Sequence, residues 1–164
     1  MTAIELRQRL DQEVQSFFNQ TRGAQGGEVS VSTLTYADFL SDKMLIIEII
    51  RQGVPYSMFN LIRNSTPFSE GDWADILDIS TKSLQRYKQS ARNFKSIQSE
   101  KIIEMAEVTH AGLEVFGDME RFKLWLETPN FALGSHKPLE LLKDSYGKEM
   151  ILGELTRINH GILA

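Results

Sequence analysis

Five basic side chains occur within one short stretch of this 164-residue chain: Lys82, Arg86, Lys88, Arg92 and Lys95. No Asp or Glu occurs from Ile79 to Ser99. The whole chain has a formal net charge of -4, so the 143 residues outside this stretch together carry -9. A basic stretch on an otherwise acidic chain is typical of a surface that binds a polyanion, because the acidic remainder keeps the other surfaces away from it.

The segment EGDWADILDISTKSLQRYKQS, residues 70–90, has the pattern of two short, steeply crossing helices of the kind that reads DNA. Ala74 provides the small residue needed where the second helix packs closely against the first. Asp78 stands in the turn where glycine is usual, and Asp tolerates the left-handed conformation better than most residues. Apolar residues occupy the joint and the inner side of the second helix: Trp73, Leu77, Ile79, Leu84 and Tyr87. The spacing therefore predicts a helix-turn-helix.

In such a pair the second helix is capped by Ser80, and its exposed face carries side chains of the types that read base edges. The basic residues that follow are expected to meet phosphates, which position a protein without reading sequence. The predicted DNA-binding residues are Ser80, Thr81, Lys82, Ser83, Gln85 and Arg86, followed by Lys88, Arg92 and Lys95.

The alternative interpretation is a solvated basic helix in an ordinary helical protein. Surface helices usually mix the two signs of charge, so the absence of acidic residues across 21 positions favours DNA binding.

The residues that catalysis would require are not grouped in this sequence. His110, His136 and His160 stand far apart, and there is no cysteine to complete a metal site. The sequence contains neither a glycine-rich phosphate loop between a strand and a helix nor a Gly-x-Ser-x-Gly motif. We therefore expect no catalytic residue, no metal, no cofactor and no enzymatic activity.

The composition, 41% hydrophobic and 24% charged, is that of a globular protein rather than a disordered one. The absence of cysteine fits a reducing compartment. The N-terminal residues resemble no signal peptide, and no apolar run reaches the eighteen or so residues that a membrane span needs. We expect a cytoplasmic protein that does not associate with membranes.

An N-terminal helix is predicted over residues 3–19, where Thr2 and Glu5 form a possible capping box. From Gln20 the composition changes to a glycine-rich linker, which ends near Glu28. The alternation in VSVSTLTY, residues 29–36, suggests a short strand.

The rest of the chain is predicted to be helical, with start and stop signals between the segments. Ser41, Ser69, Ser99, Asp118 and Asp144 stand where they can cap helices, and Gly53 and Gly117 where they can end them. Pro55 suits the first turn of one helix, and a short turn is expected at residues 138–142. On the last helix the apolar residues form one packing face: Met150, Ile151, Leu155, Ile158 and Ile162. The expected fold class is all-α.

The C-terminal segment FGDMERFKLWLETPNFALGSHKPLELLKDSYGKEMILGELTRINHGILA, residues 116–164, resembles the toxin-binding domain of the Xre/MbcA/ParS antitoxins. The resemblance rests on an ordered series of motifs: Trp125-Leu126, Pro129-Asn130, Leu133-Gly134, Pro138-Leu139 and the terminal Gly161. Upstream, QGVPYSMFNLIR and ILDISTKSLQRY resemble the DNA-binding half of the same antitoxins. Together these segments cover residues 42 to 164.

The resemblance implies a type II antitoxin paired with a RES-domain toxin, a class of NAD-degrading proteins. The antitoxin would block the toxin with its C-terminal region and repress the shared operon with its helix-turn-helix. The implied toxin-binding residues are Asn130, Leu133, Gly134, Arg157, Asn159, His160 and Gly161. The alternative for the first three is maintenance of the fold, and Trp125 and Leu126 are expected to be core residues.

Three parts are predicted: an N-terminal helix and flexible linker (1–36), a helix-turn-helix DNA-binding domain (37–98) and a small helical toxin-binding domain (99–164). We expect a homodimer that binds an inverted repeat in its own promoter, because one recognition helix covers too few base pairs for specificity. Two alternatives stay open: a repressor without a toxin partner, and a toxin-inhibiting module that no longer binds DNA.

Overall fold

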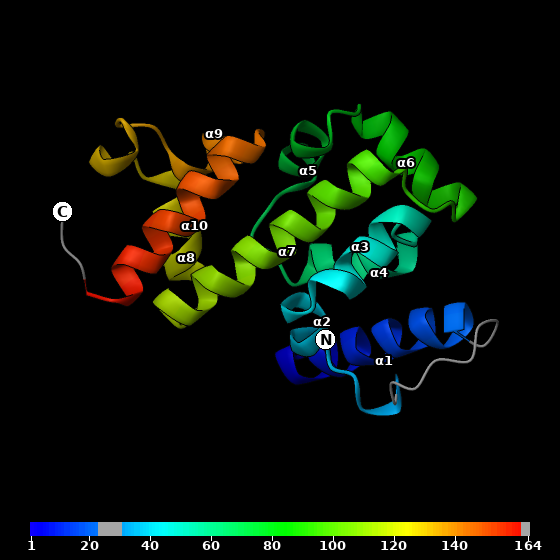
Figure 1. The fold of residues 1–164 in the computed structure, drawn as a ribbon. Helices are drawn as coiled ribbons and strands as arrows, with labels where there is room; N and C mark the ends of the chain where they lie inside the picture. Colours follow the sequence, from blue (N-terminus) through cyan, green and yellow to red (C-terminus); the bar gives the residue numbers. More distant parts are fainter. Residues whose placement is uncertain (23–30, 162–164) are drawn as a thin grey trace. The chain divides into compact units, whose positions relative to one another are not determined.

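The structure, a computed structural model, describes residues 1–22 and 31–161 (Figure 1). Within these ranges it contains helices and 3-10 turns but no β-strand, which confirms the all-α prediction. The elements are α1 (Ala3–Arg22), η1 (Val31–Thr33), α2 (Tyr36–Ser41), α3 (Lys43–Gln52), α4 (Tyr56–Asn64), α5 (Glu70–Leu77), α6 (Thr81–Ser90), α7 (Ser96–Phe116), α8 (Met119–Glu127), η2 (Phe131–Leu133), α9 (Pro138–Leu141) and α10 (Ser145–Asn159).

The chain forms two compact units that do not follow its order. Unit 1 contains residues 1–65 and 87–100, and unit 2 contains residues 66–86 and 101–164. The end of α6 and the start of α7 therefore belong to unit 1, while the rest of both helices belongs to unit 2.

In unit 1, helix α1 packs against α4 and also contacts α2 and η1 (Figure 1). Its packing face consists of Leu10, Val14, Phe17 and Phe18, which are all buried. The predicted capping box is present, because the Thr2 amide donates to Glu5 and the Glu5 amide donates to the Thr2 hydroxyl. The helix continues to Arg22, beyond the predicted end at residue 19. The linker predicted after it lies mostly outside the described residues.

The strand predicted over residues 29–36 is wrong for the described part of that segment. Residues 31–33 form η1, and Tyr36 begins α2. The Thr35 hydroxyl accepts from the Asp38 amide, and the Thr35 amide donates to the Asp38 carboxylate, so this pair starts a helix. These bonds with Thr35 hold the pKa of the Asp38 carboxyl below its usual value, so the capping box weakens as pH falls through that lowered pKa.

The backbone before α2 is satisfied without a strand partner. The Tyr36 amide donates to Asp11 at 2.7 Å, and the Gln15 side chain donates to the Leu34 carbonyl at 2.8 Å. Side chains of α1 thus replace the ladder bonds that a strand would need. Burial raises the pKa of the Tyr36 phenol well above its usual value, although a hydrogen bond with Ser65 opposes this.

The predicted helix start at Ser41 is also wrong, because Asp42 caps α3. The Asp42 carboxylate accepts from the amides of Met44 and Leu45 at 3.0 and 3.2 Å, whereas the Ser41 hydroxyl donates to the Ala37 carbonyl inside α2. One carboxylate oxygen satisfies two free amides and favours the positive end of the helix.

Ser99 does not start α7, as the sequence suggested, because that helix begins at Ser96. Ser99 is completely buried in unit 1. Its hydroxyl accepts from the Val54 amide at 2.8 Å and donates to the Phe94 carbonyl at 3.3 Å. The side chain that looked like a cap instead satisfies a buried backbone amide far away in sequence.

In unit 2, α7 contacts α8 through the stacked rings of Phe116 and Phe122, and contacts α10 through the ion pair of Glu107 with Lys148. The buried residues of these three helices include Ile102, Met105, Phe122, Leu126 and Ile151. Asp118 caps α8 by accepting from the Arg121 amide, as predicted. Asp144 stands at the cap position of α10, but its side chain makes no cap hydrogen bond. On the predicted face of α10, Ile151 and Leu155 are buried while Met150 is half exposed; Ile162 lies outside the described residues.

Gly147 allows α10 to pack against the end of α9. A Cβ at this position would collide with the carbonyl oxygen of Leu141, which is rigid backbone. Gly153 lies on the same helix, is exposed, and would have no atom within 4 Å of an added Cβ. The two glycines therefore form a matched pair.

We predict that Gly147→Ala lowers the free energy of unfolding by about 2–3 kcal/mol or more, because the backbone must move to admit the methyl group. Gly153→Ala should raise it by about 0.5–1 kcal/mol, because alanine is the better helix former. Urea unfolding followed by circular dichroism measures both values. Equal effects of the two substitutions would contradict the close packing of α10 on α9.

Candidate nucleic-acid interface and partner-binding region

Helices α5 and α6 are joined by a tight turn at Asp78, which lies in the left-handed region with φ 52° and ψ 47°. The Ile79 amide donates to the Ala74 carbonyl at 3.1 Å across this turn. Ser69 and Asp72 form a capping box at the start of α5. The sequence prediction that Asp replaces the usual glycine here is confirmed.

The joint between these helices is apolar, as predicted. Trp73, Ala74 and Leu77 of α5 are buried, and Leu84 is the buried residue of α6. Phe68 packs edge-on against Trp73, with ring centroids 5.7 Å apart. Tyr87, at the other end of α6, belongs to unit 1 and stacks on Phe94 at 4.3 Å. Leu84 and Tyr87 thus pack on the inner side of α6, and the opposite face of the helix is exposed to solvent.

The N-terminus of α6 is organised by two serines. The Ser80 hydroxyl accepts from the Ser83 amide and donates to the Ser83 hydroxyl, both at 3.0 Å. Ser80 therefore caps the helix, as predicted, and the two hydroxyls satisfy each other. Thr81, Lys82 and their neighbours one turn later remain exposed.

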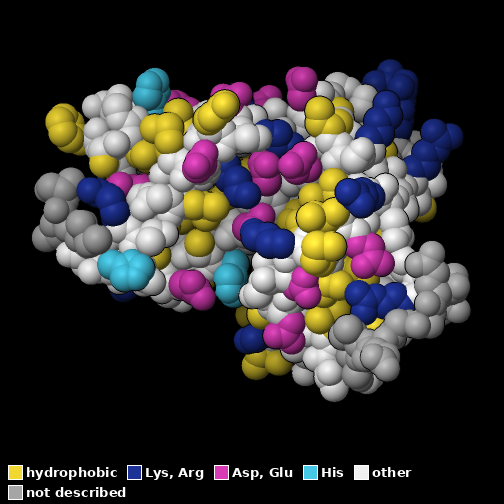
Figure 2. Space-filling model, viewed as in Figure 1, with side chains coloured by type: hydrophobic (Ala, Val, Ile, Leu, Met, Phe, Trp, Pro, Cys, Tyr) yellow, Lys and Arg dark blue, Asp and Glu magenta, His cyan; other side chains and the backbone are white. Residues whose placement is uncertain are grey.

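Lys82, Gln85 and Arg86 share one face of α6 because residues three and four apart are neighbours on a helix. All three are exposed. In Figure 2 Lys and Arg side chains gather over the α6 region. We define these three residues as the reading face. Lys and Arg side chains can donate to the acceptors of guanine, and a Gln side chain can pair with the edge of adenine.

The remaining basic residues predicted for phosphate contact, Lys88, Arg92 and Lys95, are all exposed and belong to unit 1. Lys88 lies in the last turn of α6, and Ala91 then adopts a left-handed conformation with φ 49° that ends the helix. Arg92 and Lys95 lie on the connection to α7.

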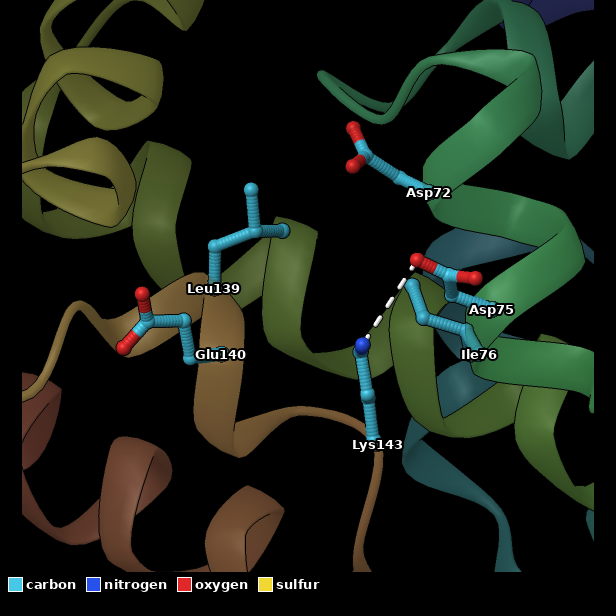
Figure 3. Close-up of a pocket in the computed structure, with 6 residues that line it drawn as sticks. All are labelled: Asp72, Asp75, Ile76, Leu139, Glu140 and Lys143. Atoms are coloured by element: carbon cyan, nitrogen blue, oxygen red, sulfur yellow. Dashed lines mark ion pairs between the residues drawn. The ribbon is translucent and has the colours of Figure 1, made fainter.

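One pocket of unit 2 lies between α5 and α9 and has a volume of about 130 Å³ (Figure 3). Ile76 and Leu139 provide its apolar wall, and Lys143 forms an ion pair with Asp75 at 3.5 Å. In Figure 3 the Glu140 carboxylate points away from Asp72 and Asp75. In the described residues no group of three or more acidic or His side chains could hold a metal ion.

The histidines occupy three separate places. His110 on α7 lies 3.5 Å from Glu114, and His136 lies 3.8 Å from Glu140. The His160 ring contacts the Thr156 carbonyl at 2.8 Å. Each histidine thus interacts with a residue four positions away along the chain.

The turn at residues 130–136 brings together Asn130, Leu133 and Gly134, which the sequence assigned to partner binding. Asn130 organises the turn through two hydrogen bonds. Its side-chain oxygen accepts from the backbone amide of Ala132 at 2.9 Å, and its backbone amide donates to the His136 carbonyl at 3.0 Å. Gly134 is left-handed with φ 67°, and Leu133 is buried with 4% of its surface exposed.

Phe131, the neighbour of these residues, has 93% of its surface exposed and was missed by sequence reasoning. A phenylalanine between turn-forming residues carries no sequence signal for whether it points inward or outward. Leu126 is buried, which agrees with its predicted core role. Trp125 is only half-buried, although its ring packs on Phe116 and Phe122.

The predicted tail residues lie at the end of α10 in unit 2. The half-buried Arg157 donates twice to the buried Glu154, at 2.9 and 3.1 Å. Asn159, His160 and Gly161 are exposed, and Gly161 is left-handed with φ 67°. At the end of α10, Arg157 is therefore held by its ion pair with Glu154, whereas Asn159, His160 and Gly161 are exposed.

Two family models match the chain in tandem. The antitoxin Xre-like helix-turn-helix domain matches residues 45–107, and the antitoxin Xre/MbcA/ParS C-terminal toxin-binding domain matches residues 111–161. The chain belongs to the Xre/MbcA/ParS antitoxin family. This antitoxin thus combines a helix-turn-helix with a toxin-binding domain.

Curated relatives support the same assignment. The antitoxin is 26% identical over 117 residues to "Antitoxin Xre" of Photorhabdus laumondii, covering 71% of this chain and 79% of the relative. It is 23% identical over 121 residues to "Antitoxin Xre" of Yersinia enterocolitica, covering 73% of this chain and 82% of the relative.

A solved structure has a related fold. A chain in the crystal structure of the M. tuberculosis MbcT–MbcA toxin–antitoxin complex aligns with a TM-score of 0.50 at 24% identity. The alignment covers 59% of the antitoxin and 86% of that chain. In the part of the antitoxin that the structure describes, no helix is both long and apolar enough to cross a membrane.

On the interpretation that α6 reads bases, we predict that Lys82→Ala and Arg86→Ala each weaken binding to promoter DNA by about 10-fold or more and reduce the preference over random DNA, because each would remove a predicted base contact. Lys95→Ala should weaken binding to promoter DNA and to random DNA by the same factor, because it would remove a predicted phosphate contact. The slope of the logarithm of the binding constant against the logarithm of salt concentration should become shallower by about 1. Fluorescence anisotropy at several salt concentrations measures these effects.

The matched control is Lys123→Ala on α8, an exposed lysine outside the basic stretch. It should leave both affinities unchanged. Equal losses for Lys82 and Lys123 would mean that overall charge, rather than the reading face, governs binding.

Proposed function

We propose that this chain is a type II antitoxin that neutralises a RES-domain, NAD-degrading toxin and represses its own operon. It acts in the cytoplasm as a homodimer and has no catalytic activity of its own. The observation that carries the proposal is the tandem order of a helix-turn-helix and a toxin-binding domain in one chain. The RES identity of the partner rests on the resemblance of residues 116–164 to antitoxins of that class.

In this proposal residues 37–98 bind DNA and residues 99–164 bind the toxin. The toxin-binding residues are the turn residues Asn130, Leu133 and Gly134 and the tail residues Arg157, Asn159, His160 and Gly161. Leu133 acts from the core by fixing the turn, since 4% of its surface is exposed. Asn159 and His160 are exposed near the C-terminus, and a chain end can enter a cleft.

The DNA-binding half of the proposal follows from the charge distribution. The reading face is exposed on α6, and no acidic residue occurs from Ile79 to Ser99. Two copies present two reading faces to the half-sites of an inverted repeat, which supplies the specificity that one helix lacks. Repression follows when the occupied repeat overlaps the promoter.

Toxin neutralisation is tested by mixing the antitoxin with the toxin encoded beside it and measuring NAD consumption. We expect the antitoxin to abolish NAD consumption and the double substitution Asn159→Ala, His160→Ala to reduce inhibition by about 10-fold or more, because a polar tail in a cleft loses buried hydrogen bonds. His110→Ala on α7 is the control and should inhibit normally. A partner that does not consume NAD would contradict the RES assignment.

Promoter binding is tested by its salt dependence. With about four phosphates neutralised by each protomer, the logarithm of the binding constant should fall with the logarithm of salt concentration with a slope of roughly -7 for a dimer. A slope near zero would favour the interaction module that has lost DNA binding. Promoter binding by a chain with no neighbouring toxin gene would favour the repressor without a toxin partner.

A further inference from the structure

We propose that Phe131 is the hydrophobic anchor by which the antitoxin docks onto its cognate toxin. This inference rests on the proposed function, which supplies the partner, and adds a contact residue that neither the sequence motifs nor the family assignment identifies.

Phe131 is the most exposed of the large hydrophobic residues in the described ranges, with 93% of its surface in water. Scattered apolar residues are common on protein surfaces, so exposure alone would carry little weight. The other large apolar side chains exposed within residues 111–161 are less exposed: Tyr146 is 83%, Leu124 67% and Met150 49% exposed. Phe131 has almost no intramolecular contact.

The backbone under Phe131 is fixed, so the ring cannot turn inward. The amides of Leu133 and Ser135 donate to the Asn130 carbonyl at 3.0 and 2.9 Å, and the Gly134 amide donates to the Phe131 carbonyl at 3.1 Å. Leu133 anchors the turn in the core of unit 2. A flexible loop could bury its aromatic residue, whereas this hydrogen-bonded turn keeps the ring in solvent.

A rigid, exposed aromatic ring is what an interface anchor requires. Little conformational freedom is lost when it binds, because the turn is ordered in advance. Aromatic residues that fill a pocket on the partner contribute a large share of binding energy. The residues around Phe131, including Ala132, Gly134 and Ser135, are small and exposed, so a partner can close around the ring.

The occupant of this anchor is the toxin. Phe131 lies in the middle of residues 111–161, which match a toxin-binding domain. DNA is a poor partner for this turn, since residues 128–136 contain no Lys or Arg to meet phosphates. The chemistry that fits the ring is an apolar pocket on a folded protein.

The test measures the affinity of the full-length antitoxin for the toxin encoded by the neighbouring gene, by calorimetry or surface plasmon resonance. Phe131→Ala should weaken binding by about 30-fold or more, mainly through faster dissociation. Phe131→Leu, which keeps an apolar side chain, should recover part of the affinity. Because the ring is exposed, the melting temperature and promoter affinity of both variants should match those of the unaltered protein.

Ile97→Ala is the matched control, because Ile97 on α7 is also exposed, at 65%, but lies outside the toxin-binding match. It should bind the toxin normally.

If the unaltered antitoxin binds the toxin and Phe131→Ala binds equally well, the anchor is refuted while the proposed function stands. If Phe131→Ala instead reduces self-association without changing toxin affinity, the ring serves a second copy and the inference is overturned. If the unaltered antitoxin does not bind the toxin, the proposed function fails and the anchor with it.

Discussion

A buried hydrogen-bonded junction in unit 1 determines how the chain passes from the recognition helix to α7. The Val54 amide donates to the Ser99 hydroxyl at 2.8 Å, and the Phe94 amide donates to the Val54 carbonyl at 2.9 Å. These groups are buried, so losing one bond would leave a backbone amide unsatisfied at a cost of about 1–3 kcal/mol. Phe94 also packs against Phe59 and Tyr87, which fixes the end of α6. The exposed basic residues before and after this junction depend on it for their positions.

The second constraint is electrostatic. Five basic residues lie in a stretch without acid, while the rest of the chain carries -9. The start of α6 is stabilised by Ser80 and Ser83 rather than by carboxylates, although Asp and Glu would interact more favourably with the helix dipole. A carboxylate at this position would stabilise the helix but would also repel a polyanion. The neutral side chains of Ser80 and Ser83 cap the helix without adding negative charge.

The compact units place the two tasks of an antitoxin in an unexpected arrangement. Unit 2 contains α5, the first half of α6 and the whole segment that matches the toxin-binding domain. Lys143, which follows α9, forms an ion pair with Asp75 of α5 inside this unit. The first helix of the helix-turn-helix therefore belongs to the same compact unit as the toxin-binding part, and α1 to α4 belong to the other unit. Exposed ion pairs contribute little, so the apolar core of the unit supplies most of the stability that holds them together.

The sequence by itself determined the features that depend on neighbouring residues. Asp78 in the left-handed turn, Gly53 and Gly117 at helix ends, Ser80 at its cap and the basic stretch all follow from local chemistry that the order of residues displays. The motifs also indicated the family.

Only the tertiary structure decided what depends on distant residues. Ser99 looked like a helix cap, but its hydroxyl instead accepts from the buried amide of Val54, which is distant in the sequence. The segment at residues 31–36 became a turn and a helix because Asp11 and Gln15 of α1 satisfy its backbone. Whether Phe131 or Leu133 points into the core was equally hidden, because burial depends on how the turn between them sits on unit 2, which residues remote in the sequence determine.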